Sequence, residues 1–257
     1  MKVKTAEDAE IMIQKLPCDM GIHRNPRKGT LNAPGEIVDR FEPEENILVD
    51  EVFPDEFDLE ETHERMYQNT LSLSQYGKPV LSVGGDHSVS FPVIRALKEE
   101  NPDMKLVWLD AHLDLKEKVE GNVSHDVVVR ELLNKGFSED EIVFVGVTEV
   151  DADEDKFLEE HDIQVYHAEE VPQFLDNYNP GGKNYLSIDI DVLNESEAPG
   201  TGYPDGQLSM QQVEKVVEKV SPQHADIVEV APTLDNEGKT VKNAVDVLGK
   251  LVKQITG

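Results

Sequence analysis

The chain has 257 residues, enough for one large α/β domain spanning 1–257, and no linker rich in proline, glycine or serine divides it. Its formal charge of −29, from 53 acidic and 24 basic residues, excludes nucleic acid and anionic membranes as favourable partners. The single cysteine, Cys18, excludes an internal disulfide, and no segment is apolar for long enough to act as a signal peptide or to cross a membrane. We therefore expect a cytoplasmic protein.

Apolar runs of strand length recur along the chain, at residues 46–49, 79–83, 105–109, 142–147, 184–188 and 226–230. Several are apolar at consecutive positions, which is typical of strands covered on both faces. Segments with helical spacing lie between them, at residues 58–77, 89–100, 126–136, 152–161, 213–220 and 241–255. The alternation predicts a three-layer α/β/α fold with a mostly parallel central sheet. Residues 19–43, rich in proline and glycine, are predicted to form a long loop near the mouth of a site.

Clusters of metal-binding residue types follow three of these runs: GGDHS at 84–88, DAHLD at 110–114 and SIDID at 187–191. In an open parallel sheet, ligands bind beyond the carboxyl ends of the strands, so the clusters should meet there. Together they offer two imidazoles and four carboxylates, from His87, His112, Asp110, Asp114, Asp189 and Asp191. This set is large enough to hold two divalent metals, which would generate a hydroxide nucleophile at neutral pH.

Each cluster also has an ordinary interpretation. His87 alone would more often be a hydrogen-bonded histidine than a ligand, and the carboxylates at 110–114 could belong to a solvated strand end. However, Trp108 and Leu109 should be buried, which leaves the following carboxylates poorly solvated without a cation. On an extended backbone, the alternating polar side chains of each cluster would share one face. Like charges that close repel unless a cation lies between them, so the three clusters together favour a metal site.

These stretches resemble the ureohydrolases, the family of arginase and agmatinase. The similarity covers most of the chain from about residue 79 and includes GGDHS at 84–88, DAHLD at 110–114, SH at 124–125, SIDIDVL at 187–193, APGTG at 198–202 and EVAP at 229–232. The motifs look most like those of archaeal agmatinases. The resemblance implies an arginase-like fold, two Mn²⁺ per chain, and a homotrimer or homohexamer.

By this resemblance, the first metal would be bound by His87, Asp110, Asp114 and Asp189. The second would be bound by His112 and Asp191, with Asp110 and Asp189 bridging the two. Asp114 would pass a proton to the leaving amine, His125 would carry protons to solvent, and Glu229 would pair with a guanidinium group. The ordinary alternatives are a helix-start histidine at 125 and a surface glutamate on an edge strand at 229. The other histidines (His23, His63, His161, His167 and His224) lack such context and are expected at the surface.

The chain departs from the family pattern in three places. Asn194-Glu195 replaces a common Asp-Pro, Asp126 replaces a small residue, and Ala231 replaces a common Asn. Asp126 and the acidic N-terminal loop favour a small guanidino substrate with a second positive charge. The expected reaction is therefore hydrolysis of agmatine to putrescine and urea by a metal-bridging hydroxide.

Several alternatives stay open. Related amidine hydrolases act on aminopropylagmatine, arginine, guanidinobutyrate, formiminoglutamate or guanidine. A single-metal deacetylase of related fold is disfavoured because the second ligand pair, His112 and Asp191, is present. A non-catalytic component that keeps the fold is disfavoured because all six presumed ligands are present.

Overall fold

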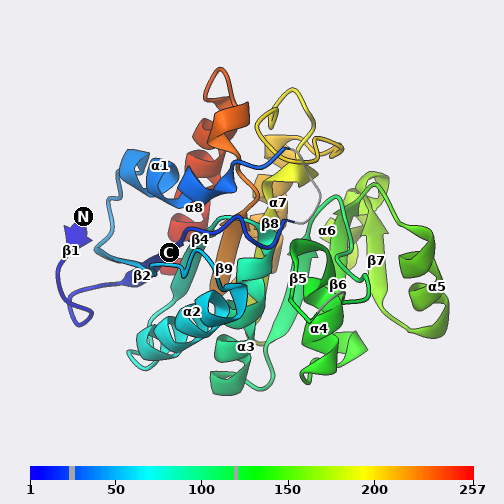
Figure 1. Ribbon diagram of the computed structural model, residues 1–257, viewed down its shortest axis with the longest axis horizontal. Helices are drawn as coiled ribbons and strands as arrows, with labels where there is room; N and C mark the ends of the chain where they lie inside the picture. The colour runs from blue at the N-terminus through cyan, green and yellow to red at the C-terminus, as the bar shows by residue number, and fades with distance from the viewer. Residues whose placement is uncertain (23–26, 119–120) are drawn as a thin grey trace.

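A computed structural model describes residues 1–22, 27–118 and 121–257. These residues form one sheet of nine parallel strands in the order β1-β3-β2-β4-β9-β8-β5-β6-β7 (Figure 1). The strands are β1 (Lys2–Val3), β2 (Ile11–Leu16), β3 (Ile47–Glu51), β4 (Val80–Gly84), β5 (Lys105–Leu109), β6 (Ile142–Val147), β7 (Gln164–His167), β8 (Asn184–Asp189) and β9 (His224–Val228).

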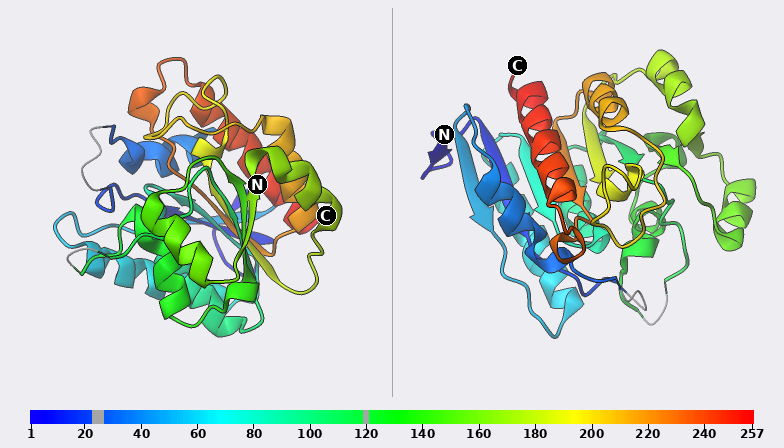
Figure 2. Two further views of the ribbon diagram at one scale, coloured as in Figure 1. Left: turned by 90° about the vertical axis from the view of Figure 1, so that its right-hand side faces the viewer. Right: turned by 90° about the horizontal axis from the view of Figure 1, so that it is seen from above.

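Eight α-helices of the described residues cover the two faces of the sheet. Their bounds are α1 (Ala33–Arg40), α2 (Leu59–Ser74), α3 (Ser90–Glu100), α4 (Val128–Asn134), α5 (Ala152–Glu160), α6 (Val171–Asn177), α7 (Met210–Val220) and α8 (Lys239–Thr256). One apolar core lies under α1, α6, α7 and α8, and the other lies under α2 to α5. Helices α1, α7 and α8 lie side by side on their face (Figure 2). The three-layer α/β/α prediction is confirmed.

The central strands are apolar because both of their faces are covered. Every residue of β4, β6, β8 and β9 is buried, as are the last four residues of β5. The apolar stripe of α7 consists of buried Val213, Val216, Val217 and Val220, as its spacing predicts. The six strands and six helices expected from the sequence are all present, with their ends displaced by a few residues.

The prediction that residues 19–43 form only a loop is wrong for α1. This helix begins with Ala33 and Pro34, and proline is tolerated in a first turn because its missing N–H would have no helical partner there. Ala33, Ile37 and Val38 bury one face of α1 against the core. Eight residues that include a proline and a glycine give too short a periodic pattern to identify the helix from sequence. Among the described residues, no helix combines the length and apolar character needed to cross a membrane.

Candidate metal centre and active site

The three clusters meet at the carboxyl ends of β4, β8 and β5, which together with β9 are neighbours in the middle of the sheet. A cavity of about 240 Å³ opens there. Its lining residues are His87, His112, Asp114, Lys116, His125, Asp126, Glu149, Asp151, Glu154, Asp189, Asp191, Tyr203 and Glu229. A larger cavity, of about 510 Å³, lies beside α2 and α3 and contains none of the expected ligands, so chemistry rather than size identifies the site.

The turn after β4 depends on two glycines. A Cβ on Gly85 would lie 1.8 Å from the carbonyl oxygen of Cys18, and one on Gly84 would lie 2.6 Å from Val89 Cγ2. Both positions therefore require glycine. Asp86 then caps the short helix that carries His87, because its Oδ1 accepts the Ser88 N–H at 3.0 Å. This capped turn fixes His87 at the end of the strand.

The aspartate clusters reach the site through bends rather than through the extended backbone that the alternation predicted. Asp110 follows the end of β5, and its Oδ1 accepts the His112 N–H at 2.7 Å. Asp189 ends β8, and its Oδ1 accepts the Asp191 N–H at 2.8 Å. In each pair the first side chain hydrogen-bonds the backbone two residues on, so both side chains turn into one pocket.

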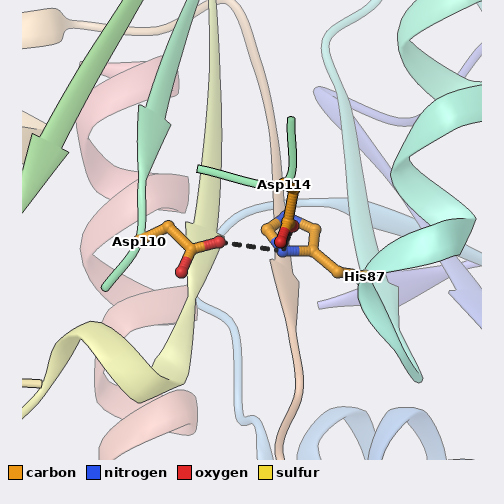
Figure 3. Close-up of side chains that lie close together, drawn as sticks. All are labelled: His87, Asp110 and Asp114. Atoms are coloured by element: carbon orange, nitrogen blue, oxygen red, sulfur yellow. Dashed lines mark ion pairs between the residues drawn. The ribbon is translucent and has the colours of Figure 1, made fainter. Parts of the chain in front are cut away.

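His87 Nδ1 is surrounded by carboxylate oxygens. It lies 3.1 Å from Asp110 Oδ2 and 3.2 Å from Asp114 Oδ2 (Figure 3). Asp189 Oδ2 also lies 3.2 Å from it. His87 Nδ1 and Asp110 Oδ2 are fully buried, yet neither has a partner with hydrogen-bond geometry. Buried polar atoms that converge without aligned hydrogen bonds fit the donor set of a divalent cation.

A second group of donors adjoins the first. His112 Nδ1 lies 3.1 Å from Asp191 Oδ2 and 3.4 Å from Asp110 Oδ1. Asp110 thus directs one oxygen to each histidine. Ligand atoms of His87, Asp110 and Asp114, and separately of Asp110, His112 and Asp191, lie within 4.8 Å of one another. These two groups share Asp110 and hold five of the six expected ligands, and the sixth, Asp189, lies 3.2 Å from His87 Nδ1.

The buried carboxylates of these groups repel one another, and a nearby positive charge would stabilise them. Burial raises the pKa of Asp189 well above its usual value, and it raises the pKa of Asp191 to about 6, with the charges of neighbouring aspartates adding to both shifts. Burial alone would lower the pKa of His87, but the negative carboxylates of Asp110, Asp114 and Asp189 around it favour its protonated form and raise the pKa well above its usual value. The raised pKa values of His87, Asp189 and Asp191 mean that these groups hold protons more tightly than usual, whereas the pKa of Asp110 is lowered by the two histidines. Bound cations would replace those protons.

A buried chain of side chains stands behind His87. Its Nε2 lies 2.9 Å from Ser187 Oγ, which donates to Asp226 Oδ1 at 2.7 Å. Tyr185 donates to the other Asp226 oxygen at 2.6 Å. The Trp108 ring stacks on the imidazole with a centroid distance of 4.0 Å and an interplanar angle of 6°. Because Ser187 donates its proton to Asp226, it accepts the Nε2 proton of His87, and Nδ1 is left to face the carboxylates.

Glu229 is buried next to this group, and the edge-strand alternative is wrong. The preceding strand, β9, lies between β4 and β8, and Glu229 follows it with a left-handed backbone (φ 62°). Its Oε1 accepts the His87 N–H at 2.7 Å, and burial raises its pKa to about 8. Asp114 is also left-handed (φ 52°). Such backbone strain in non-glycine residues often accompanies functional sites.

His125 begins a short helix, as the ordinary interpretation expects, and it also lines the cavity; its role in carrying protons stays a prediction. Its Nδ1 lies 2.9 Å from the carbonyl oxygen of Gly21, so the N-terminal loop reaches the site as expected. Burial tends to lower the pKa of His125, but the charges of Glu229 and Asp114 outweigh it and raise the pKa.

The outer wall of the cavity holds residues that the sequence analysis missed. Lys116 Nζ lies 2.6 Å from Asp151 Oδ2, and Glu154 Oε1 accepts the Leu115 N–H at 2.9 Å. Glu149 also lines the cavity, and Tyr203 lines it beside His112 and His125. A signal was available for Glu149 and Asp151, because they follow the strand β6 just as the identified clusters follow theirs.

Two histidines expected at the surface are buried. His63 Nε2 lies 3.1 Å from Ser88 Oγ, and His224 Nδ1 accepts the Val80 N–H at 3.1 Å. Both belong to the packing of the sheet and its helices. His161 and His167 are partly exposed, and His23 lies outside the described residues.

The chain matches known proteins over most of its length. The model of the Arginase family matches residues 9–253. An agmatinase of Bacillus subtilis is 31% identical over 191 residues, covering 70% of this chain and 65% of that protein. An arginase of Staphylococcus aureus is 26% identical over 255 residues, covering 86% and 82%. The crystal structure of a Trypanosoma cruzi formiminoglutamase with Mn²⁺ superimposes with a TM-score of 0.89 at 23% identity, covering 99% and 96%. The chain therefore belongs to the arginase family of ureohydrolases.

Proposed function

We propose that this protein hydrolyses the guanidino group of agmatine to putrescine and urea at a site that holds two manganese ions. The observation that carries the proposal is the placement of Asp110, which directs one oxygen to His87 at 3.1 Å and the other to His112 at 3.4 Å. A carboxylate shared in this way supports two adjacent cations. Oxygen-rich ligation with two imidazoles suits manganese.

When bound, two such cations lower the pKa of water and so supply a nucleophile near neutral pH. Glu229 would accept N–H groups of the guanidinium and hold its central carbon in the cavity. The water oxygen forms a bond to that carbon, and Asp114 takes the released proton. Asp114 then delivers a proton to the leaving nitrogen as the C–N bond breaks, which yields urea and the amine. His125 would exchange protons between the cavity and solvent.

The choice of agmatine rests on the outer wall. Four acidic side chains line the cavity, against one lysine: Asp126, Glu149, Asp151 and Glu154, with Lys116 2.6 Å from Asp151. A substrate tail that ends in an ammonium group complements this excess of negative charge. The relatives above bear the names agmatinase, arginase and formiminoglutamase, so the wall, rather than the relatives, supports agmatine.

Lys116 supports a second candidate. Lys116 lines the cavity two residues after Asp114, and its ammonium group, now 2.6 Å from Asp151 Oδ2, would exchange this partner for a substrate carboxylate. An amidine with an acidic tail, such as guanidinobutyrate or formiminoglutamate, would use this pairing.

The test is product release by manganese-loaded protein from agmatine, arginine, guanidinobutyrate and formiminoglutamate. We expect urea from agmatine with the highest kcat/KM, loss of activity on chelation and recovery with Mn²⁺. Asp110→Asn should abolish activity, whereas Asp103→Asn, an exposed control just before β5, should not. Faster turnover of an acid-tailed amidine would overturn the agmatine assignment. Full activity in Asp110→Asn would overturn the two-metal proposal.

A further inference from the structure

Tyr203 lines the cavity beside two residues of the candidate site. Its ring centroid lies 5.6 Å from that of His112 at an interplanar angle of 69°, and 6.2 Å from that of His125 at 20°. Tyr203 is 39% exposed, and the two histidines beside it are themselves only partly buried. The ring therefore forms an accessible aromatic wall near the metal end of the cavity.

The loop that carries Tyr203 is tightly packed on both sides of it. A Cβ on Gly206 would lie 2.0 Å from the Asp191 carbonyl oxygen, and one on Gly200 would lie 2.4 Å from Asp235 Cβ. The Gly200 carbonyl also accepts the Ala231 N–H at 2.7 Å, two residues after Glu229. Tyr203 is thus held at a fixed place relative to the ligand Asp191 and to Glu229.

We propose that Tyr203 is a substrate-binding residue whose aromatic face packs against the planar guanidinium cation. This inference rests on the proposed function and specifies that the Tyr203 ring binds the guanidinium group of the substrate. Glu229 would bind the edge of the guanidinium through its N–H groups, which leaves the flat face for an aromatic ring. A cation over such a face is attracted by the ring quadrupole, whereas neutral urea of the same shape is attracted less. The same contact would bind substrate more tightly than product.

The experiment compares Tyr203→Leu, Tyr203→Phe and the control Tyr76→Leu, which changes a 50% exposed tyrosine just after α2. We expect Tyr203→Leu to raise the KM for agmatine roughly tenfold while kcat changes by less than about twofold. Tyr203→Phe should retain the wild-type KM because it keeps the ring. Inhibition by a charged and a neutral compound of similar shape should distinguish charge from shape. In Tyr203→Leu the inhibition constant of butylguanidine should rise roughly tenfold, and that of butylurea should stay unchanged.

Three results would overturn the inference: an unchanged KM in Tyr203→Leu, an equal loss in Tyr203→Phe, or an equal weakening of butylguanidine and butylurea. Manganese affinity is measured on the same variants through Trp108 fluorescence and should stay at the wild-type value. A loss of that affinity would instead indicate a structural role. If the wild-type protein hydrolyses no amidine, the proposed function fails. Calorimetric titration of the same variants with butylguanidine and butylurea then still decides the role of Tyr203.

Discussion

At the scale of single residues, the site combines strain with unfavourable burial. Glu229 and Asp114 have left-handed backbones, and Glu229, Asp189 and Asp191 are buried carboxyl groups whose pKa values burial raises. A fold retains such costs when they serve binding or chemistry. The costs would be offset when cations and a guanidinium enter the cavity.

Glu229 is the residue whose charge should control substrate binding. Its pKa is raised to about 8, and only the carboxylate can pair with guanidinium, so kcat/KM should rise with pH through this region and fall as the group is protonated. We expect Glu229→Gln to lower kcat/KM by about 10²- to 10³-fold and to remove this limb of the pH profile. If the pH dependence of kcat/KM is unchanged in Glu229→Gln, the rise with pH is due to the titration of another group. Glu237→Gln, an exposed neighbour, is the control.

Ser187 should act on metal binding through His87. Removing its hydroxyl breaks the link from His87 Nε2 to Asp226 and leaves the imidazole free to rotate. We expect Ser187→Ala to weaken manganese binding by about 10- to 100-fold. The measurement is the quenching of Trp108 fluorescence by Mn²⁺, with the exposed change Ser72→Ala as control. Equal affinities in the two variants would contradict the role of this chain of hydrogen bonds.

At the scale of elements, the sequence predicts those helices and strands that have a periodic or continuous apolar pattern, and those site residues that directly follow a buried strand. The buried strands β4, β5 and β8 and the clusters after them were identifiable because buried strands are continuously apolar, so the charged residues that follow stand out from them. Strand β2 was missed because Gln14 and Lys15 interrupt its apolar run. Gln14 is nevertheless buried, since its Nε2 donates to Thr70 and Ser82 at 2.9 Å. Tertiary partners of this kind leave no local pattern.

The same limit applies to Tyr203 and Lys116. No periodicity marks either residue, because each reaches the cavity from a loop whose path is set by packing against distant segments. His112 and Asp191 could be paired from their strand-end positions. The bends that aim their side chains could not be anticipated, because they depend on hydrogen bonds that their backbone N–H groups donate to Asp110 and Asp189.

The start of α5 carries a prediction for stability. Glu154 accepts the N–H groups of Leu115 and Asp151, which ties this helix to the loop after Asp114. Burial raises its pKa from 4.5 to about 7. A carboxyl group whose folded pKa is raised costs stability progressively as pH rises between those two values.

Glutamine at this position does not titrate. The difference in unfolding free energy between Glu154→Gln and wild type should therefore grow more favourable to the variant by on the order of 1–3 kcal/mol from about pH 5 to about pH 8. Denaturant unfolding at the two pH values measures this change. A difference that stays constant or reverses would show that Glu154 is ionised in the folded protein at both.

At the scale of the whole molecule, the large negative net charge is the feature expected to affect stability most. A net charge of −29 on 257 residues produces repulsion that salt screens. We expect the thermal midpoint to rise as NaCl increases from about 0.1 M to about 2 M, measured by circular dichroism on apo protein so that metal binding does not contribute. A falling midpoint would mean that ion pairs, such as Lys98 with Glu141 at 2.8 Å, stabilise the fold more than repulsion weakens it. The homotrimer or homohexamer expected from the family resemblance stays a prediction that sedimentation can test.

The central claim is that two cations share Asp110 between His87 and His112. Anomalous diffraction at the manganese edge from crystals of loaded protein tests it most directly. We predict two peaks about 3.5–4 Å apart, one within bonding distance of His87 Nδ1 and the other of His112 Nδ1. A single peak, or peaks away from these two nitrogens, would contradict the claim.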